Sequence, residues 1–227
     1  MALYAIGDLH LSLQTDKPMD IFRGWSDYVE RLREGFSFLT AEDTTVLLGD
    51  VSWAMGLEKA VKDFAFISAI PGRKIILKGN HDYWWSTAKK FSEFCAANAF
   101  ENLFLLNNNC YEYGDIAICG TRGWFYEEEQ KGSHDEKIVL REMQRLETSL
   151  RAAGDREKLC FLHYPPRYRD YICPEVEEML ARYGVKQCFY GHLHAESRKS
   201  ACEGEVNGLF YRLLSADHLG FRPARIL

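Results

Sequence analysis

Long hydrophobic runs are absent from this sequence, and its cysteines follow no pairing pattern. No run is long and apolar enough to span a bilayer, so we expect no association with a membrane. The seven cysteines are an odd number without a Cys-x-x-Cys pair, which indicates neither a disulfide framework nor a thiolate zinc site. The first residues also lack the basic segment and the cleavage site of a signal peptide. The expected compartment is the cytoplasm.

An excess of basic residues is absent as well. The formal net charge is −5, which gives no support for a large nucleic-acid-binding surface. Hydrophobic residues make up 47% of the chain and charged residues 27%, a balance typical of soluble globular proteins. The 227 residues contain no internal repeat, low-complexity tract or linker, so we predict a single domain over residues 1–227. Nothing in the sequence indicates the oligomeric state.

One short stretch has an unusual ending. Residues 74–77 are rich in β-branched and aliphatic side chains and predict a strand. The run stops at Gly79, where the backbone can turn sharply, and Asn80, His81 and Asp82 follow at once. A polar loop that caps the strand is the simple interpretation of one such ending. Its repetition along the chain favours a functional site instead.

Four other predicted strands end in the same way. Five of the seven histidines lie at such strand ends, which random placement would seldom produce. In α/β proteins with mostly parallel strands, the carboxyl ends of the strands are where ligand sites collect. The strands cover residues 2–6, 44–48, 158–162 and 185–190, followed by Asp8 and His10, by Asp50, by His163, and by His192 and His194. We therefore expect these side chains to converge on one site.

Helical periodicity appears between these strands. Apolar residues recur every three or four positions there, which predicts helices. Ser86 is a candidate N-cap for one of them, and Asn207 with Gly208 predicts a hairpin turn. The predicted helices cover residues 25–39, 57–69, 86–98, 134–153 and 174–182, and further strands cover 103–106 and 116–119.

The residue types at the strand ends suit metal ions of intermediate softness. Imidazole, carboxylate and amide oxygen together favour Mn, Fe or Zn. The ligands are too many for one four-coordinate ion, whereas two ions that share a carboxylate would use them all. Two ions about 3.5–4 Å apart can clamp the attacking and leaving oxygens of a phosphoryl displacement. The sequence therefore predicts two divalent metal ions as cofactors.

These motifs resemble those of the calcineurin-like metallophosphoesterase superfamily, and in particular of its bacterial-type predicted phosphohydrolases. The resemblance runs from residue 8 to residue 194, and the five motifs in this order are far more specific than any one alone. It implies an α/β fold, a four-layer α-β-β-α sandwich with two mixed sheets inside and helices outside. The motifs are Asp8-x-His10, Gly49-Asp50, Gly79-Asn80-His81-Asp82, His163 and Gly191-His192-x-His194.

The resemblance also implies a role for each of these side chains. It implies attack of a metal-bridging hydroxide on a phosphomonoester or phosphodiester of a small phosphorylated substrate. His81 would be the catalytic residue that donates to a phosphate oxygen or to the leaving group. The first metal would be held by Asp8, His10 and His194, the second by Asn80, His163 and His192, and Asp50 would bridge the two.

The chain departs from the family pattern just after Asp50. Protein phosphatases of this superfamily have a second Asp and then Arg-Gly there, but this chain continues Val51-Ser52-Trp53-Ala54. The carboxylate expected to orient the catalytic histidine is therefore missing, which argues against the protein-phosphatase subgroup. Asp82 is one candidate replacement beside His81, although adjacency in sequence does not establish contact.

Two kinds of side chain near these motifs are candidates for substrate contacts. Trp53 and Tyr83 belong to a dense group of aromatics that could stack on a nucleobase, although packing is the commoner role. Arg122 follows a predicted strand and could grip a phosphate, or else form a surface ion pair.

Two other functions fit the same residues. One is a metal-containing module with weak or lost turnover that binds a phosphorylated partner, although every catalytic position is filled. The other is a nuclease of the same superfamily, which would need a basic groove that the acidic balance does not favour.

Overall fold

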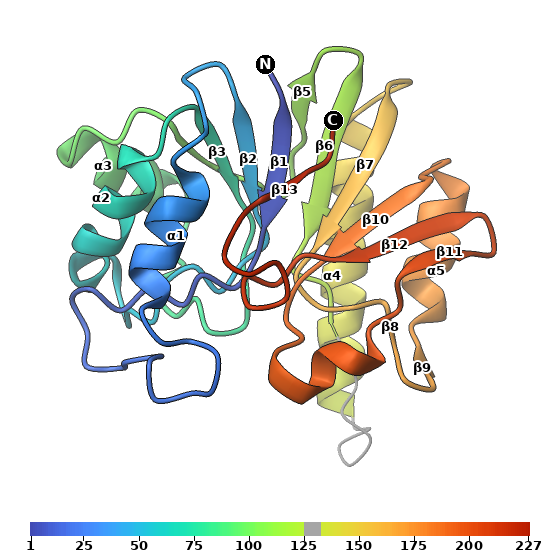
Figure 1. Cartoon of the computed structure of the whole chain (residues 1–227). Coiled ribbons are helices and arrows are strands. Elements are labelled where there is room, and N and C mark those ends of the chain that lie inside the picture. The colour runs from blue at the N-terminus through green and yellow to red at the C-terminus, as the bar shows by residue number, and fades with distance from the viewer. Residues whose placement is uncertain (125–132) are drawn as a thin grey trace.

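The computed structural model describes residues 1–124 and 133–227 and contains two large mixed β-sheets (Figure 1). The first sheet has the strand order β13-β1-β2-β3-β4, with β1 to β4 parallel and β13 antiparallel to β1. Its strands are β1 (Leu3–Ile6), β2 (Thr44–Leu47), β3 (Arg73–Ile76), β4 (Leu103–Leu105) and β13 (Ala224–Arg225).

The second sheet has the order β11-β12-β10-β7-β6-β5. Its four inner strands are parallel, and the two edge strands β11 and β5 are antiparallel to their neighbours. Its strands are β5 (Tyr111–Tyr113), β6 (Ile116–Thr121), β7 (Glu157–Leu162), β10 (Gln187–Tyr190), β11 (Gly204–Val206) and β12 (Leu209–Leu213). A separate hairpin pairs β8 (Arg167–Tyr168) with β9 (Tyr171–Ile172).

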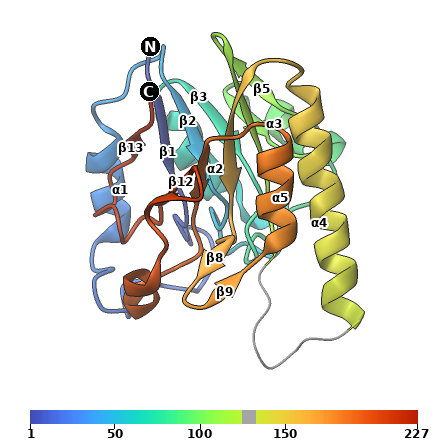
Figure 2. The ribbon, with the colours of Figure 1, turned by 90° about the vertical axis from the view of Figure 1, so that its right-hand side faces the viewer.

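Helices cover the outer face of each sheet. The helices α1 (Tyr28–Phe36), α2 (Val61–Ala69) and α3 (Ala88–Ala97) pack on the first sheet. The helices α4 (Ser133–Ala152) and α5 (Pro174–Arg182) pack on the second, as Figure 2 shows from the side. The predicted four-layer α-β-β-α sandwich is thus confirmed.

The strands alternate between two apolar environments because successive side chains of a strand face opposite sides of the sheet. In β1, Ala5 faces the second sheet, whereas Ile6 packs under the helices of the first layer. In β7, Phe161 faces the first sheet, whereas Cys160 and Leu162 face α4 and α5. Both faces of each sheet are therefore buried, and the ends of the parallel strands are where polar groups can reach a ligand.

Most predicted elements are present, with three differences. Residues 57–69 form a short 3₁₀ turn (Leu57–Lys59) followed by α2, rather than one helix. Thr87, and not Ser86, caps α3, because its side chain accepts a hydrogen bond from the Lys90 N–H at 3.2 Å. A second 3₁₀ helix (Ala195–Ser200) and several short strands had no predicted counterpart. None of the helices in the described ranges combines the length and apolar character needed to cross a membrane.

Candidate metal centre

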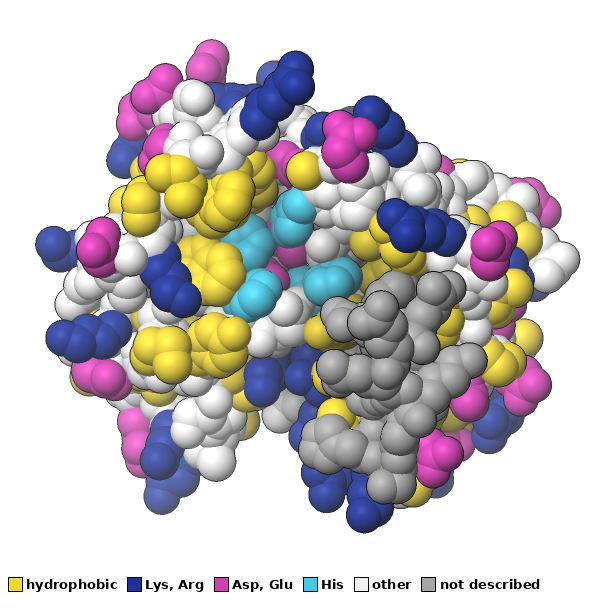
Figure 3. All heavy atoms as spheres, turned by 90° about the horizontal axis from the view of Figure 1, so that it is seen from below, with side chains coloured by type: hydrophobic (Ala, Val, Ile, Leu, Met, Phe, Trp, Pro, Cys, Tyr) yellow, Lys and Arg dark blue, Asp and Glu magenta, His cyan; other side chains and the backbone are white. Residues whose placement is uncertain are grey.

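The polar residues that follow five strands come together at one edge of the two sheets. They follow β1, β2 and β3 in the first sheet and β7 and β10 in the second. Viewed onto this edge, histidine side chains surround a hollow with acidic side chains at its base, and Lys and Arg side chains border the group (Figure 3). The structure thus brings together eight of the strand-end residues that the sequence analysis singled out, namely Asp8, His10, Asp50, Asn80, His81, His163, His192 and His194.

Several of these residues adopt a backbone conformation that L-amino acids rarely use. The φ angles are 61° at Asp8, 47° at His10, 49° at Asp50 and 71° at His192, all in the left-handed region. Each such residue costs about 1–2 kcal/mol relative to ordinary backbone. This conformation turns the chain sharply at the strand end, so that each side chain points along the edge into the hollow.

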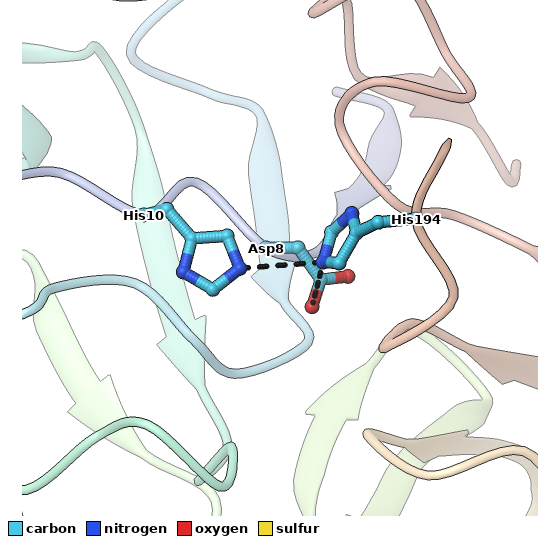
Figure 4. Close-up of side chains that lie close together, drawn as sticks. All are labelled: Asp8, His10 and His194. Carbon is cyan, nitrogen blue, oxygen red and sulfur yellow. Dashed lines mark hydrogen bonds and ion pairs between the residues drawn. The ribbon is translucent and has the colours of Figure 1, made fainter. Parts of the chain in front are cut away.

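One group of side chains combines β1 with the loop after β10. Asp8 Oδ1 lies 3.3 Å from His194 Nε2, and His10 Nε2 lies 3.2 Å from the same nitrogen. Figure 4 shows Asp8 and His10 converging on His194. Single ligand atoms of the three residues all lie within 4.8 Å of one another, so one ion could contact all three.

A second group adjoins the first. Ligand atoms of Asp8, Asp50 and His163 also lie within 4.8 Å of one another. Asp50 Oδ2 lies 3.6 Å from His163 Nε2 and 3.8 Å from His10 Nε2, so it stands between the two groups. Asn80 Oδ1 adds to the second group, at 2.6 Å from His163 Nε2 and 3.0 Å from His192 Nδ1.

In this centre, atoms that accept hydrogen bonds face one another without a donor between them. The pKa of His163 is lowered to about 4, chiefly by burial, so its ring is neutral near pH 7. Its Nδ1–H donates to the Leu48 carbonyl at 2.8 Å, which leaves a lone pair on Nε2 facing Asn80 Oδ1. Independently of how the Asn80 amide is turned, buried Asp8 Oδ1 accepts no hydrogen bond of ordinary geometry within the described residues, and only the ion-pair contact with His194 Nε2 at 3.3 Å approaches one. Divalent cations fit such a donor set.

The electrostatics also call for positive charge. Burial raises the pKa of Asp50 well above its usual value, and the nearby carboxylates of Asp82 and Asp8 raise it further. Burial likewise lowers the pKa of His10, His163 and His192, so these rings are neutral and available as ligands. Bound cations would offset the repulsion between these buried carboxylates.

Asp217 is a member of the centre that the sequence analysis missed. Its Oδ1 lies 3.1 Å from His194 Nδ1, and its Oδ2 accepts a hydrogen bond from the Ala195 N–H at 3.0 Å. A carboxylate in this position fixes which ring nitrogen of the histidine faces a metal. Asp217 follows β12 by a few residues, so the strand-end signal that identified the other residues was present here too.

His81 lies at the rim of the centre. Its backbone N–H donates to Asp50 Oδ1 at 2.7 Å, and its ring lies 4.4 Å from the ring of Trp53, centre to centre. Its Nδ1 lies 3.3 Å from the Tyr83 hydroxyl. Tyr83, and not Asp82, is therefore the hydrogen-bond partner of this ring.

The aromatic residues divide into packing and rim positions. Trp84 is buried in the core beside the first sheet. Trp53 stacks on His10 with ring centres 5.0 Å apart, and Tyr83 is 49% exposed beside His81. Arg122 is mostly buried, and its side chain pairs with buried Glu142 rather than forming a surface ion pair. Contacts of Trp53, Tyr83 and Arg122 with a substrate remain predictions.

Asp82 joins the loops of the centre through hydrogen bonds to their backbone. Its carboxylate is buried and accepts hydrogen bonds from five N–H groups. The backbone donors belong to Gly79 at 2.7 Å, Asp50 at 2.8 Å, Val51 at 2.9 Å and Ser52 at 3.4 Å, and the fifth donor is Trp84 Nε1 at 2.8 Å. The loops after β2 and β3 are thereby joined through one side chain.

We expect Asp82→Ala to destabilise the protein strongly, because several buried N–H groups would lose their acceptor. Each donor left without a partner costs about 1–3 kcal/mol, so even if water reaches some of the five donors, the free energy of unfolding should fall by at least about 3 kcal/mol. Urea denaturation measures this loss. The exposed Asp16→Ala should change stability by no more than about 0.5 kcal/mol. Equal stability of the two variants would show that Asp82 does not hold these loops.

Metal binding to the stripped protein should tighten as the pH rises. Burial alone would lower the pKa of His194, but Asp8 and Asp217 raise it to about 10, so a metal must displace a proton there. Release of one proton lowers the apparent Kd about tenfold per pH unit below that pKa. Competition of Mn²⁺ with a chelating dye at pH 7 and pH 8 measures the change. A Kd that is the same at both would contradict it, and Asp217→Asn should move the dependence to lower pH.

Comparison with known proteins gives the same fold. The profile of the family described as calcineurin-like phosphoesterase matches residues 1–196. No curated protein sequence matches the chain significantly. Among solved structures, the phosphopantetheinyl hydrolase PptH from Mycobacterium tuberculosis superposes with a TM-score of 0.60 at 14% identity, covering 100% of this chain and 95% of that one.

Two further structures are similar at the level of fold. The protein of unknown function AQ665 from Aquifex aeolicus superposes with a TM-score of 0.55 at 17% identity, covering 99% of this chain and 95% of that one. The protein TT1561 from Thermus thermophilus gives a TM-score of 0.51 at 11% identity, covering 98% and 96%.

Proposed function

The chain belongs to the calcineurin-like phosphoesterase family, and from this premise we propose that it is a phosphoesterase that uses two divalent metal ions. Its substrate would be a small phosphomonoester or phosphodiester. The observation that carries the proposal is the pair of adjoining ligand groups, which share Asp8 and have Asp50 Oδ2 between them.

The residues divide naturally between two ions. His10 and His194 lie on one side of the centre, and Asn80, His163 and His192 lie on the other. Asp50 is proposed as the bridge, since one of its oxygens is nearly equidistant from His10 and His163. Bound there, Mn, Fe or Zn would supply the positive charge that neutralises phosphoryl oxygens and acidifies the attacking water.

His81 is proposed as the proton donor. Burial lowers its pKa, so the neutral ring has one N–H to give. If the Tyr83 hydroxyl donates to Nδ1, the proton stays on Nε2. From the rim of the centre, Nε2–H would donate to a phosphoryl oxygen or to the departing oxygen. Trp53 packs against the same ring and limits its orientation.

We expect the metal-stripped protein to regain turnover of an aryl phosphate or an aryl phosphodiester when Mn²⁺ is restored. His81→Ala should lower kcat about 100-fold or more while the metal content per chain is unchanged. His218→Ala, on a half-buried residue outside the centre, serves as the matched control. A folded, metal-loaded protein that turns over neither compound would overturn the proposal and favour a binding module.

A pair of charge-removing variants tests the assignment of the bridge. Asp50→Asn keeps the shape of the side chain but removes the charge that holds two cations close together. We expect it to weaken one metal by about tenfold or more and to abolish most turnover, with Asp8→Asn the milder variant. Elemental analysis after dialysis gives the metals per chain. If Asp8→Asn were the more severe variant, the bridge would be Asp8, which is the residue that belongs to both ligand groups.

A further inference from the structure

A cavity of about 350 Å³ lies beside the candidate metal centre. We call it the cationic cavity and define it by Lys78, Ser86, Thr87, Arg122, Glu142 and Arg145. Its lining is joined to the centre through the backbone, because Lys78 precedes Asn80 by two residues. On the other side, the Arg122 carbonyl accepts the backbone N–H of His163 at 3.1 Å.

Among the described residues, the charges that line this cavity do not balance. Glu142 Oε1 lies 2.6 Å from Arg145 and 3.3 Å from Arg122, so one buried carboxylate serves two guanidinium groups. Its other oxygen already accepts a hydrogen bond from the Thr121 hydroxyl at 2.7 Å. Within the described residues the Lys78 ammonium group makes no ion pair or hydrogen bond, and the carboxylates of Asp82 and Glu142 attract it without direct contact. The described lining therefore carries three cations against one anion.

Hydrogen-bonding capacity also remains unused there. Arg122 Nε is buried and has no acceptor in the described part of the chain, although its neighbouring nitrogen pairs with Glu142. A buried guanidinium N–H without an acceptor is costly, so an acceptor from a ligand would be stabilising. The planar fork of an arginine suits the oxygens of a phosphate or carboxylate.

The N-terminus of α3 adds to the positive potential. Thr87, the N-cap, and Ala88 line the cavity. The first turn of this ten-residue helix contains no acidic residue that would neutralise its positive end. The helix end, Lys78 and the two arginines thus act on the same cavity.

From this excess of cations we infer that the cationic cavity binds a second anionic group of the substrate, a phosphate or a carboxylate. This inference rests on the proposed function and narrows its substrate class. The substrate is a small molecule with a phosphoester at the metal centre and a second anion on the side of Lys78 and Arg122. The volume leaves room for part of the connecting chain beside that anion.

Binding of inorganic sulfate to the metal-loaded protein tests the cavity without turnover. Calorimetry should show that Lys78→Met and Arg145→Gln each weaken sulfate binding at least about tenfold. Arg151→Gln, on an exposed residue of α4 that does not line the cavity, is the matched control. Asp50→Asn should retain the binding. Sulfate binding that is lost in Asp50→Asn and kept in Arg145→Gln would place the anion at the metals and overturn the inference.

A kinetic comparison tests the substrate class. Alkanediol bisphosphates of increasing chain length are compared with the corresponding alkyl monophosphates. At a matching length, the wild-type KM for the bisphosphate should be about tenfold lower, and Arg145→Gln should remove this preference. Equal KM values at every length would overturn the inference while leaving the phosphoesterase intact. If the protein shows no turnover but the substitutions in the cavity still weaken sulfate binding, the inferred anion site is kept and the proposed function is rejected.

Discussion

The centre depends on a single buried carboxylate. Asp82 accepts five N–H groups from the loops after β2 and β3 and from Trp84, and so holds Asp50 and Gly79 in a fixed relation. The approach is so close that a Cβ on Gly79 would lie 2.0 Å from Asp50 Oδ1. Only glycine fits there, and the contact leaves the loops no freedom to move Asp50. The position of the proposed bridging ligand therefore follows from backbone packing and not from a flexible side chain.

This rigidity has an electrostatic cost that bound cations would remove. Asp8, Asp50 and Asp82 are all buried within one small region, and burial raises the pKa values of Asp50 and Asp82, the latter to about 6. The surrounding histidines are mostly neutral because they are buried too. Four residues of the centre also adopt left-handed backbone conformations. Such a combination of strain and buried like charge is typical of a site built around a ligand.

The cationic cavity is built on the same loops as the metal centre. The loop after β3 supplies Asn80 and His81 to the metal centre and Lys78 to the cavity. The loop after β6 supplies Arg122, whose backbone is hydrogen-bonded to His163. Because the two sites share these loops, a molecule anchored in the cavity would have its other end held at a defined place beside the metals.

The sequence by itself determined the fold and eight of the side chains that meet at the centre, but it did not indicate Asp217. Apolar runs that end in Asp, His or Asn at five strands predicted that eight side chains would converge, since parallel strands bring their carboxyl ends to one edge. Tertiary structure alone decided the hydrogen-bond partners. Asp82 contacts Asp50 across 32 positions, and Asp217 contacts His194 across 23. Glu142 of α4 is shared between Arg145 and distant Arg122. Periodicity and spacing report which face a residue occupies, whereas the partner of a buried charge depends on which loops pack together in three dimensions.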